Sequence, residues 1–251
     1  GEMKSTAGAT FTAGSDGAIL ADGANTRDVY SIAAATDLVG ITGIRLEALT
    51  DPKLPAQGPG RAPNGNFVLS ELRATAAAKS DPAKTLPVAL QNASADYSQP
   101  AWDVAGAIDG NPATGWAVDA QEGKSHSAVF EMRDEVNFPG GAVFTFSFDH
   151  QFADGLHQLG KFRLSVTTSP RPLSRQGLPA EVAAILGVGA DQRTAEQRAT
   201  LAHYFRSLDS RWSDLSQRVA TSANLSRDKR LLGAQDLAWA LINSPAFLFN
   251  R

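Results

Sequence analysis

The chain has 251 residues with 43% hydrophobic residues, enough for one large domain or two smaller ones with a substantial core. It contains no cysteine, which excludes disulfides, thiolate metal sites and covalent haem attachment through Cys-x-x-Cys-His. The net charge of −3 gives no basic surface that would indicate a nucleic-acid partner. No apolar run reaches about 18 residues, so we expect no membrane span.

Charge and glycine content divide the chain into two regions. Residues 1–172 carry 19 acids, 13 bases and 18 of the 22 glycines, whereas residues 173–251 carry 7 acids and 10 bases. This difference predicts two units, 1–172 and 173–251, with a boundary near the proline-containing stretch 169–172. The first residues, 1–5, lack an apolar signal core and resemble the edge of a fragment.

The first region shows the alternation of short β-strands. The cleanest example is 142–148, where Phe144, Phe146 and Phe148 fall on one face. Further strand candidates are 29–32, 41–49, 67–74, 88–93, 127–132 and 161–168. The stretch 76–87 is interpreted as a surface connection. Many short strands separated by turn signals predict a jelly-roll β-sandwich.

The second region shows helical spacing instead. A short helix is expected at 178–187, and 194–197 resembles a capping box that opens a helix through residue 208. A helix is expected to continue after residue 210, and a last one spans 231–243. The sequence thus predicts three to four helices after the sandwich. The apolar residues 247–249 either pack against this chain or mark a contact with a partner.

One turn gathers oxygen atoms suited to a hard cation. The stretch 104–116 is interpreted as a strand end, a turn and Trp116 entering the next strand. Asp109, Asn111 and Thr114 supply side-chain oxygens of the kind that calcium prefers. Glu71, at the end of an apolar strand face, is a further candidate ligand, with an ordinary ion pair as the alternative. The alternative for the whole stretch is a self-capped turn anchored by Trp116.

Three residues are candidate ligand contacts. Arg61 and Asn64 lie in the glycine- and proline-rich loop 51–66, and loops of this length are often functional. For Arg61, a bond to loop carbonyls or a solvated charge is the alternative. Trp102 follows a loop-like stretch and is a candidate platform for stacking a sugar, with burial in the core as its alternative.

Residues 107–116, Ala-Ile-Asp-Gly-Asn-Pro-Ala-Thr-Gly-Trp, resemble the signature of discoidin-like, galactose-binding-like β-sandwich modules. The resemblance implies a structural calcium ion in this turn, with Asp109, Asn111 and Thr114 on the motif positions. Such modules add a glutamate near the end of a strand. Glu71 would take that role here, although it precedes the motif instead of following it.

Longer stretches, 44–49, 58–71 and 234–251, resemble the C-terminal part of large planctomycete proteins that combine cytochrome-c-type domains with domains of unknown function. The resemblance implies an extracytoplasmic location, periplasmic or at the cell surface. It also implies contact with other domains of a larger parent protein and a sandwich that binds polysaccharide. No haem-binding motif is present, so we expect no haem in this chain.

These observations favour a non-catalytic binding module, with carbohydrate as the expected ligand. A structural scaffold that docks other domains is the alternative. An enzyme, such as a hydrolase, is a remote third possibility: His126, His150 and His157 are available, but the sequence has no Gly-x-Ser-x-Gly, no His-Glu-x-x-His and no phosphate-binding loop. We therefore assign no catalytic residue.

Overall fold

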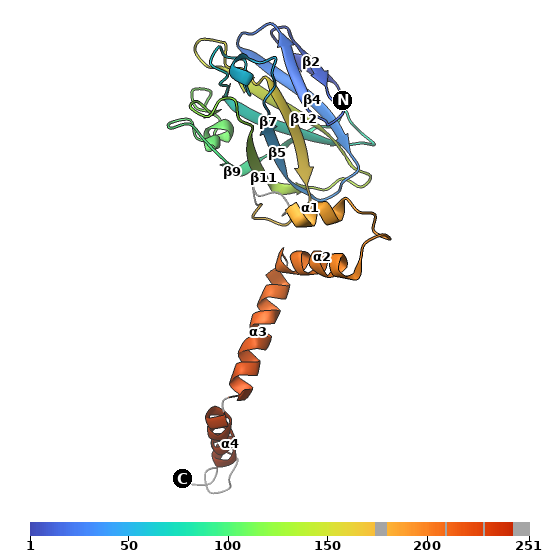
Figure 1. Cartoon of the computed structure of the whole chain (residues 1–251), viewed down its shortest axis with the longest axis vertical. Coiled ribbons are helices and arrows are strands. Elements are labelled where there is room, and N and C mark those ends of the chain that lie inside the picture. The colour runs from blue at the N-terminus through green and yellow to red at the C-terminus, as the bar shows by residue number, and fades with distance from the viewer. Residues whose placement is uncertain (174–179, 209, 228, 243–251) are drawn as a thin grey trace. The chain divides into compact units, whose positions relative to one another are not determined.

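The computed structural model describes residues 1–173, 180–208, 210–227 and 229–242. The chain divides into two compact units, Gly1–Arg175 and Gln176–Arg251. In the described residues the first unit is built of strands and the second of α-helices (Figure 1). The predicted fold class, mainly β with a helical C-terminal region, is therefore confirmed.

Unit 1 is a β-sandwich of two antiparallel sheets over one continuous core. In spatial order, the first sheet contains β1 (Met3–Ser5), β4 (Asp28–Thr36), β12 (Ala142–His150), β7 (Glu71–Ala78) and β8 (Leu86–Val88). The second contains β2 (Ala9–Ala13), β3 (Ile19–Gly23), β13 (Lys161–Thr167), β5 (Ile41–Ala48), β11 (His126–Val136) and β9 (Leu90–Ala95). A small third sheet pairs β6 (Val68–Leu69) with β10 (Trp116–Ala117).

The period-2 pattern of the central strands builds the core. In β12 every second residue is buried, so Phe144, Phe146 and Phe148 point inward as the alternation predicts. From the facing sheet, β5 contributes Ile44 and Leu46, which are fully buried. Burial of such side chains is worth about 1.5–3 kcal/mol each, so these two strands carry much of the stability of the sandwich.

Three local expectations are wrong. Residues 67–74 form two strands, β6 and β7, because Ser70 interrupts the ladder and Trp116 of β10 pairs with Leu69. Residues 76–78 continue β7, and 86–88 form β8, so 76–87 is not only a surface connection. The stretch before the predicted turn is a 3₁₀ helix, η2 (Val104–Ile108), instead of a strand end, since the Asp103 side chain accepts the Ala105 amide and caps it.

The segment that follows β13 returns onto the second sheet. The Thr42 hydroxyl lies 2.6 Å from the Ser169 carbonyl, to which it donates, and 3.1 Å from the Thr167 carbonyl. Arg171 donates to the carbonyls of β11 at Met132 and Arg133, and the amide of Leu173 donates to Glu131. Segment 169–173 therefore belongs to the body of the sandwich.

Unit 2 contains α1 (Ala180–Leu186), α2 (Ala195–Leu208), α3 (Ser210–Arg227) and α4 (Lys229–Ile242). The predicted capping box is present: Thr194 and Gln197 exchange side-chain-to-amide bonds of 2.9 and 3.2 Å. A small cluster of Val182, Ile185 and Leu201 joins α1 to α2. The predicted start at 178–179 and the apolar residues 247–249 lie outside the described residues. None of the described helices has the length and apolar character needed to cross a membrane.

Candidate ligand pocket and cation-binding turn

The turn after η2 places several oxygens around one hydroxyl. Thr114 Oγ1 lies 2.7 Å from the Asn111 carbonyl, 3.0 and 2.8 Å from the two carboxylate oxygens of Asp109, and 3.4 Å from the Gly106 carbonyl. A hydroxyl has one proton, so it cannot donate fully to all four. Two oxygens about 2.4 Å from a shared calcium ion lie roughly 2.8–3.4 Å apart. These are hydrogen-bond distances, and together with the Asn111 amide, which donates to Asp109 Oδ1 at 2.8 Å, they form the self-capped turn of the alternative. The same oxygen spacing is also compatible with one side of a calcium coordination shell.

Glu71 lies beside this turn at the start of β7. Its side chain is buried with the residue only 2% exposed, and Oε1 has no hydrogen-bond partner. Burial raises the pKa of the Glu71 carboxyl, the Arg73 charge and the Gly110 amide lower it, and the charges of Asp109 and Asp149 raise it. Gly115, at the end of the turn, lies against Leu69 and Ser70, so the turn adjoins the chain directly before Glu71. A buried carboxylate oxygen without a partner is costly, and a cation would relieve that cost.

Of the four predicted cation ligands, Asp109, Asn111 and Thr114 come together in the turn, with one change of atom, and Glu71 follows the chain segment against which the turn lies. The side-chain amide oxygen of Asn111 accepts the Ala113 amide, so the backbone carbonyl of Asn111 faces Thr114 instead. No three His, Cys, Asp or Glu side chains gather to hold a metal in the described part of the chain. A calcium ion held by only two carboxylates and neutral oxygens would be bound weakly, with a Kd on the order of 10⁻⁴–10⁻³ M.

An open pocket of about 650 Å³ lies next to this turn, and Trp102 is part of its wall. Trp102 is half-buried, and its ring meets the ring of Phe152 edge-to-face at 5.4 Å. The sequence left Trp102 open between a core position and an exposed platform. In the structure Trp102 packs against Phe152 and also lines the open pocket, so it is neither fully buried nor free of contacts.

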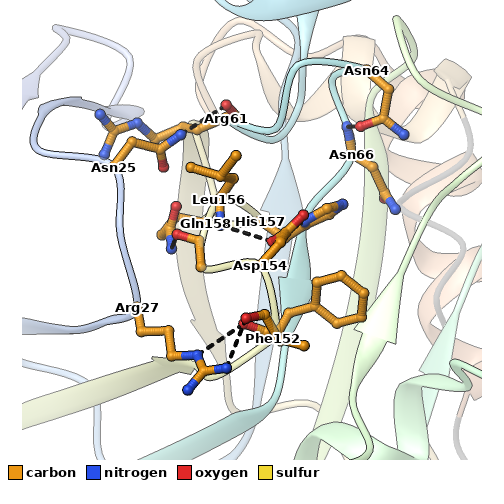
Figure 2. A network of polar contacts seen from close by, with 12 residues as sticks. Asn25, Arg27, Arg61, Asn64, Asn66, Phe152, Asp154, Leu156, His157 and Gln158 are labelled. Carbon is orange, nitrogen blue, oxygen red and sulfur yellow. Dashed lines mark hydrogen bonds and ion pairs between the residues drawn. The ribbon is translucent and has the colours of Figure 1, made fainter.

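Polar side chains from three other segments complete the pocket wall: Arg27, Ser70, Asp149 and Gln151. Arg27 donates to the backbone carbonyls of Phe152 and Ala153 at 3.1 and 2.8 Å, which fixes the loop after β12 (Figure 2). Ser70 Oγ accepts the Gln151 amide at 3.1 Å, and the Gln151 side chain donates to Asp149. The pocket therefore combines an aromatic surface with a pre-ordered set of donors and acceptors.

Arg61 and Asn64, predicted as ligand contacts, are not part of this pocket wall. The Arg61 guanidinium is buried and donates to the carbonyls of Gly23 and Ala24 at 2.6 and 2.7 Å. Arg61 therefore bonds loop carbonyls, which is one of the alternatives to a ligand contact given for it above. Asn64 donates weakly, at 3.2 and 3.3 Å, to Asp119 and Glu122.

Sequence reasoning did not identify Arg27, Asp149, Gln151 or Phe152. Three of them follow the cleanest predicted strand directly, at 149–152, where a carboxylate, an amide and an aromatic ring enter a loop. Functional side chains often stand at such strand ends because a rigid scaffold positions them there. That signal was available, whereas Arg27 had no comparable local signal.

The three histidines considered for catalysis have separate surroundings. His126 contacts Asp96 at 3.1 Å and the Gln121 carbonyl at 3.0 Å. His157 contacts Asp154 at 2.9 Å and packs its ring on Phe152. His150 is buried, with its ring 4.7 Å from that of Tyr30.

Comparisons of the chain with family models, with curated proteins and with solved structures found no match.

Proposed function

We propose that unit 1 is a non-catalytic carbohydrate-binding module of a larger extracytoplasmic protein. The observation that supports this most is the pocket in which the Trp102 ring stands beside Arg27, Asp149 and Gln151. A pyranose ring presents an apolar C–H face and a polar rim. An aromatic surface flanked by planar hydrogen-bonding side chains complements both.

We also propose that the turn 109–114 holds a structural calcium ion. Its ligands would be the carboxylates of Asp109 and Glu71, the Asn111 and Gly106 carbonyls and the Thr114 hydroxyl. The bound ion would supply a fixed positive charge that holds two carboxylates near each other. Such a weak site suits compartments with millimolar calcium, in agreement with the expected extracytoplasmic location.

Replacement of Trp102 by alanine tests the carbohydrate proposal. We expect the variant to lose at least tenfold in affinity, about 1.4 kcal/mol, for whichever polysaccharide wild type binds, because the stacking surface is removed. Affinity electrophoresis over a polysaccharide panel, with calcium at about 10 mM and thus above the expected Kd, gives the measurement.

The matched control is Trp239→Ala, since Trp239 is 72% exposed in α4 of the other unit. It should migrate like wild type in every gel. A panel in which no polysaccharide retards the wild-type chain would contradict the proposal. Equal retardation of Trp102→Ala and wild type would show that the pocket beside Trp102 is not the binding site.

A second candidate function is a scaffold that docks other domains of the parent protein. Apolar side chains exposed on α3 and α4 favour it: Trp212, Leu215, Val219, Leu237 and Trp239. Hydrogen exchange of these two helices, with and without the neighbouring domains, distinguishes the outcomes. Slower exchange supports docking, and unchanged exchange argues against it.

A further inference from the structure

The pocket and the turn are built from the same short pieces of chain. Pro112 and Ala113, which lie between the candidate ligands Asn111 and Thr114, form part of the pocket wall. Ser70, another wall residue, directly precedes Glu71. Anything that fixes the ligand oxygens therefore also fixes the adjoining wall.

Backbone contacts make this connection tight. Gly115, directly after Thr114, has φ +156°, and a Cβ there would lie 2.5 Å from the Leu69 carbonyl and 3.0 Å from Ser70 Cα. The end of the turn is thus packed against Leu69 and Ser70, directly before Glu71 begins β7. A shift of the turn cannot leave these residues in place, because close-packed backbone transmits displacement.

Ser70 passes the same constraint to the far side of the pocket. Its amide donates to the Asp149 carbonyl at 2.8 Å, and its Oγ accepts the Gln151 amide at 3.1 Å. The loop after β12, which carries Gln151 and Phe152, is therefore hydrogen-bonded to the residue next to Glu71. The turn and the loop after β12 therefore both contact Ser70, which is itself part of the pocket wall.

Without a cation in the turn, Glu71 and Asp109 work against this arrangement, because burial raises the Glu71 pKa despite the charge of Arg73. Glu71 is buried with Oε1 unpartnered, and Asp109 adds a second negative charge beside it. Asp109 is exposed whereas Glu71 is buried, so water screens the repulsion between the two carboxylates only in part. A cation bridging Glu71 and Asp109 replaces that repulsion with attraction and draws β7 and the turn together.

We propose that occupancy of the turn by a divalent cation orders the pocket walls and so raises the affinity of the pocket for its ligand. The inference rests on the proposed carbohydrate function and deepens it by naming a regulator of the same site. Coupling between two sites is reciprocal, so the ligand must raise the cation affinity by the same factor. A factor of about ten is expected, within the range of ordinary coupling energies.

The test first measures hydrogen exchange of the full chain, without any glycan, as calcium is added. Occupancy should slow exchange at 109–115, and coupling should slow it at 149–153 as well. Glycan affinity is then measured with calcium and with a chelator. In wild type we expect calcium to tighten glycan binding about tenfold.

Two variants remove the cation while keeping the shape of the site: Asp109→Asn and Thr114→Val. Both should lose the exchange response at 149–153 and bind glycan as wild type does in chelator. Asp119→Asn, which removes an exposed carboxylate from a neighbouring loop, should behave as wild type. Two different substitutions protect the conclusion against a folding defect in either one.

The outcomes separate the two proposals. If calcium slows exchange at 109–115 but changes neither 149–153 nor glycan affinity, the coupling is wrong and the carbohydrate function stands. If calcium changes no exchange at all, the coupling is also wrong. If 149–153 responds to calcium while no glycan binds, the coupling is supported and the carbohydrate assignment fails.

Discussion

Replacing Trp116 by alanine is expected to lower the free energy of unfolding of unit 1 by about 3–5 kcal/mol. Trp116 is fully buried, and its ring meets Phe67 edge-to-face at 5.0 Å. Its indole nitrogen donates to the Tyr97 carbonyl at 2.9 Å, and that acceptor would be left without this donor. Because Trp116 begins β10, which pairs with β6, the loss also loosens the strand beside Glu71.

Hydrogen exchange of β12 amides reports this stability, since the central strand opens only when the sandwich unfolds. Trp116→Phe should cost clearly less, because it keeps an aromatic ring and loses mainly the hydrogen bond. Trp239→Ala, an exposed change in the other unit, should leave β12 exchange unchanged. A Trp116→Ala protein as stable as wild type would show that the ring is not the anchor its burial indicates.

Acid is expected to destabilise unit 1 through His150. Complete burial lowers the His150 pKa from 6.5 to about 3, and the Arg61 charge lowers it as well, against the Asp28 charge and backbone, which raise it. Between pH 6.5 and about 3, His150 therefore binds a proton in the unfolded chain but not in the folded chain. The stabilisation from neutral His150 is complete above pH 6.5 and declines as the pH falls toward 3, by roughly 1 kcal/mol per pH unit.

Unfolding free energies measured at several pH values between neutral and acidic conditions test this slope. His150→Phe keeps a ring against Tyr30 and removes the titrating group. Its free energy of unfolding should therefore fall less steeply with decreasing pH, by the slope that corresponds to about one bound proton. His203→Gln, which removes an exposed histidine from α2, should retain the wild-type slope. Parallel slopes for wild type and His150→Phe would contradict the prediction.

The parts of the fold that the sequence predicts are those set by local periodicity. The alternation at 142–148 predicts β12 because the side-chain period of a strand is two, and Phe144, Phe146 and Phe148 are buried as expected. Residues 67–74 escape this rule because both faces of 66–72 are buried. A strand that is buried on both faces lacks the alternation of polar and apolar residues from which its bounds and register are predicted.

The site depends on contacts that no local pattern encodes. Glu71 reaches the turn 109–114 through strand pairing across the middle of the chain, and Arg61 finds its acceptors at Gly23 and Ala24, far away in sequence. The oxygen-rich turn itself was visible, since Asp109, Asn111 and Thr114 are close in sequence. The pocket was not predicted, because its wall joins five separate segments of the chain.

Segment 169–173 has a mechanical consequence. Strand register places Glu71 and Asp149 at one end of the first sheet, and Thr36 and Ala142 at the other. Because Ile41 begins β5 soon after Thr36, the hydrogen bond that Thr42 donates anchors the segment at this second end, away from the pocket. Tension applied to the chain beyond the segment would therefore load β5 and β11 first, and the loops that line the pocket would be strained last.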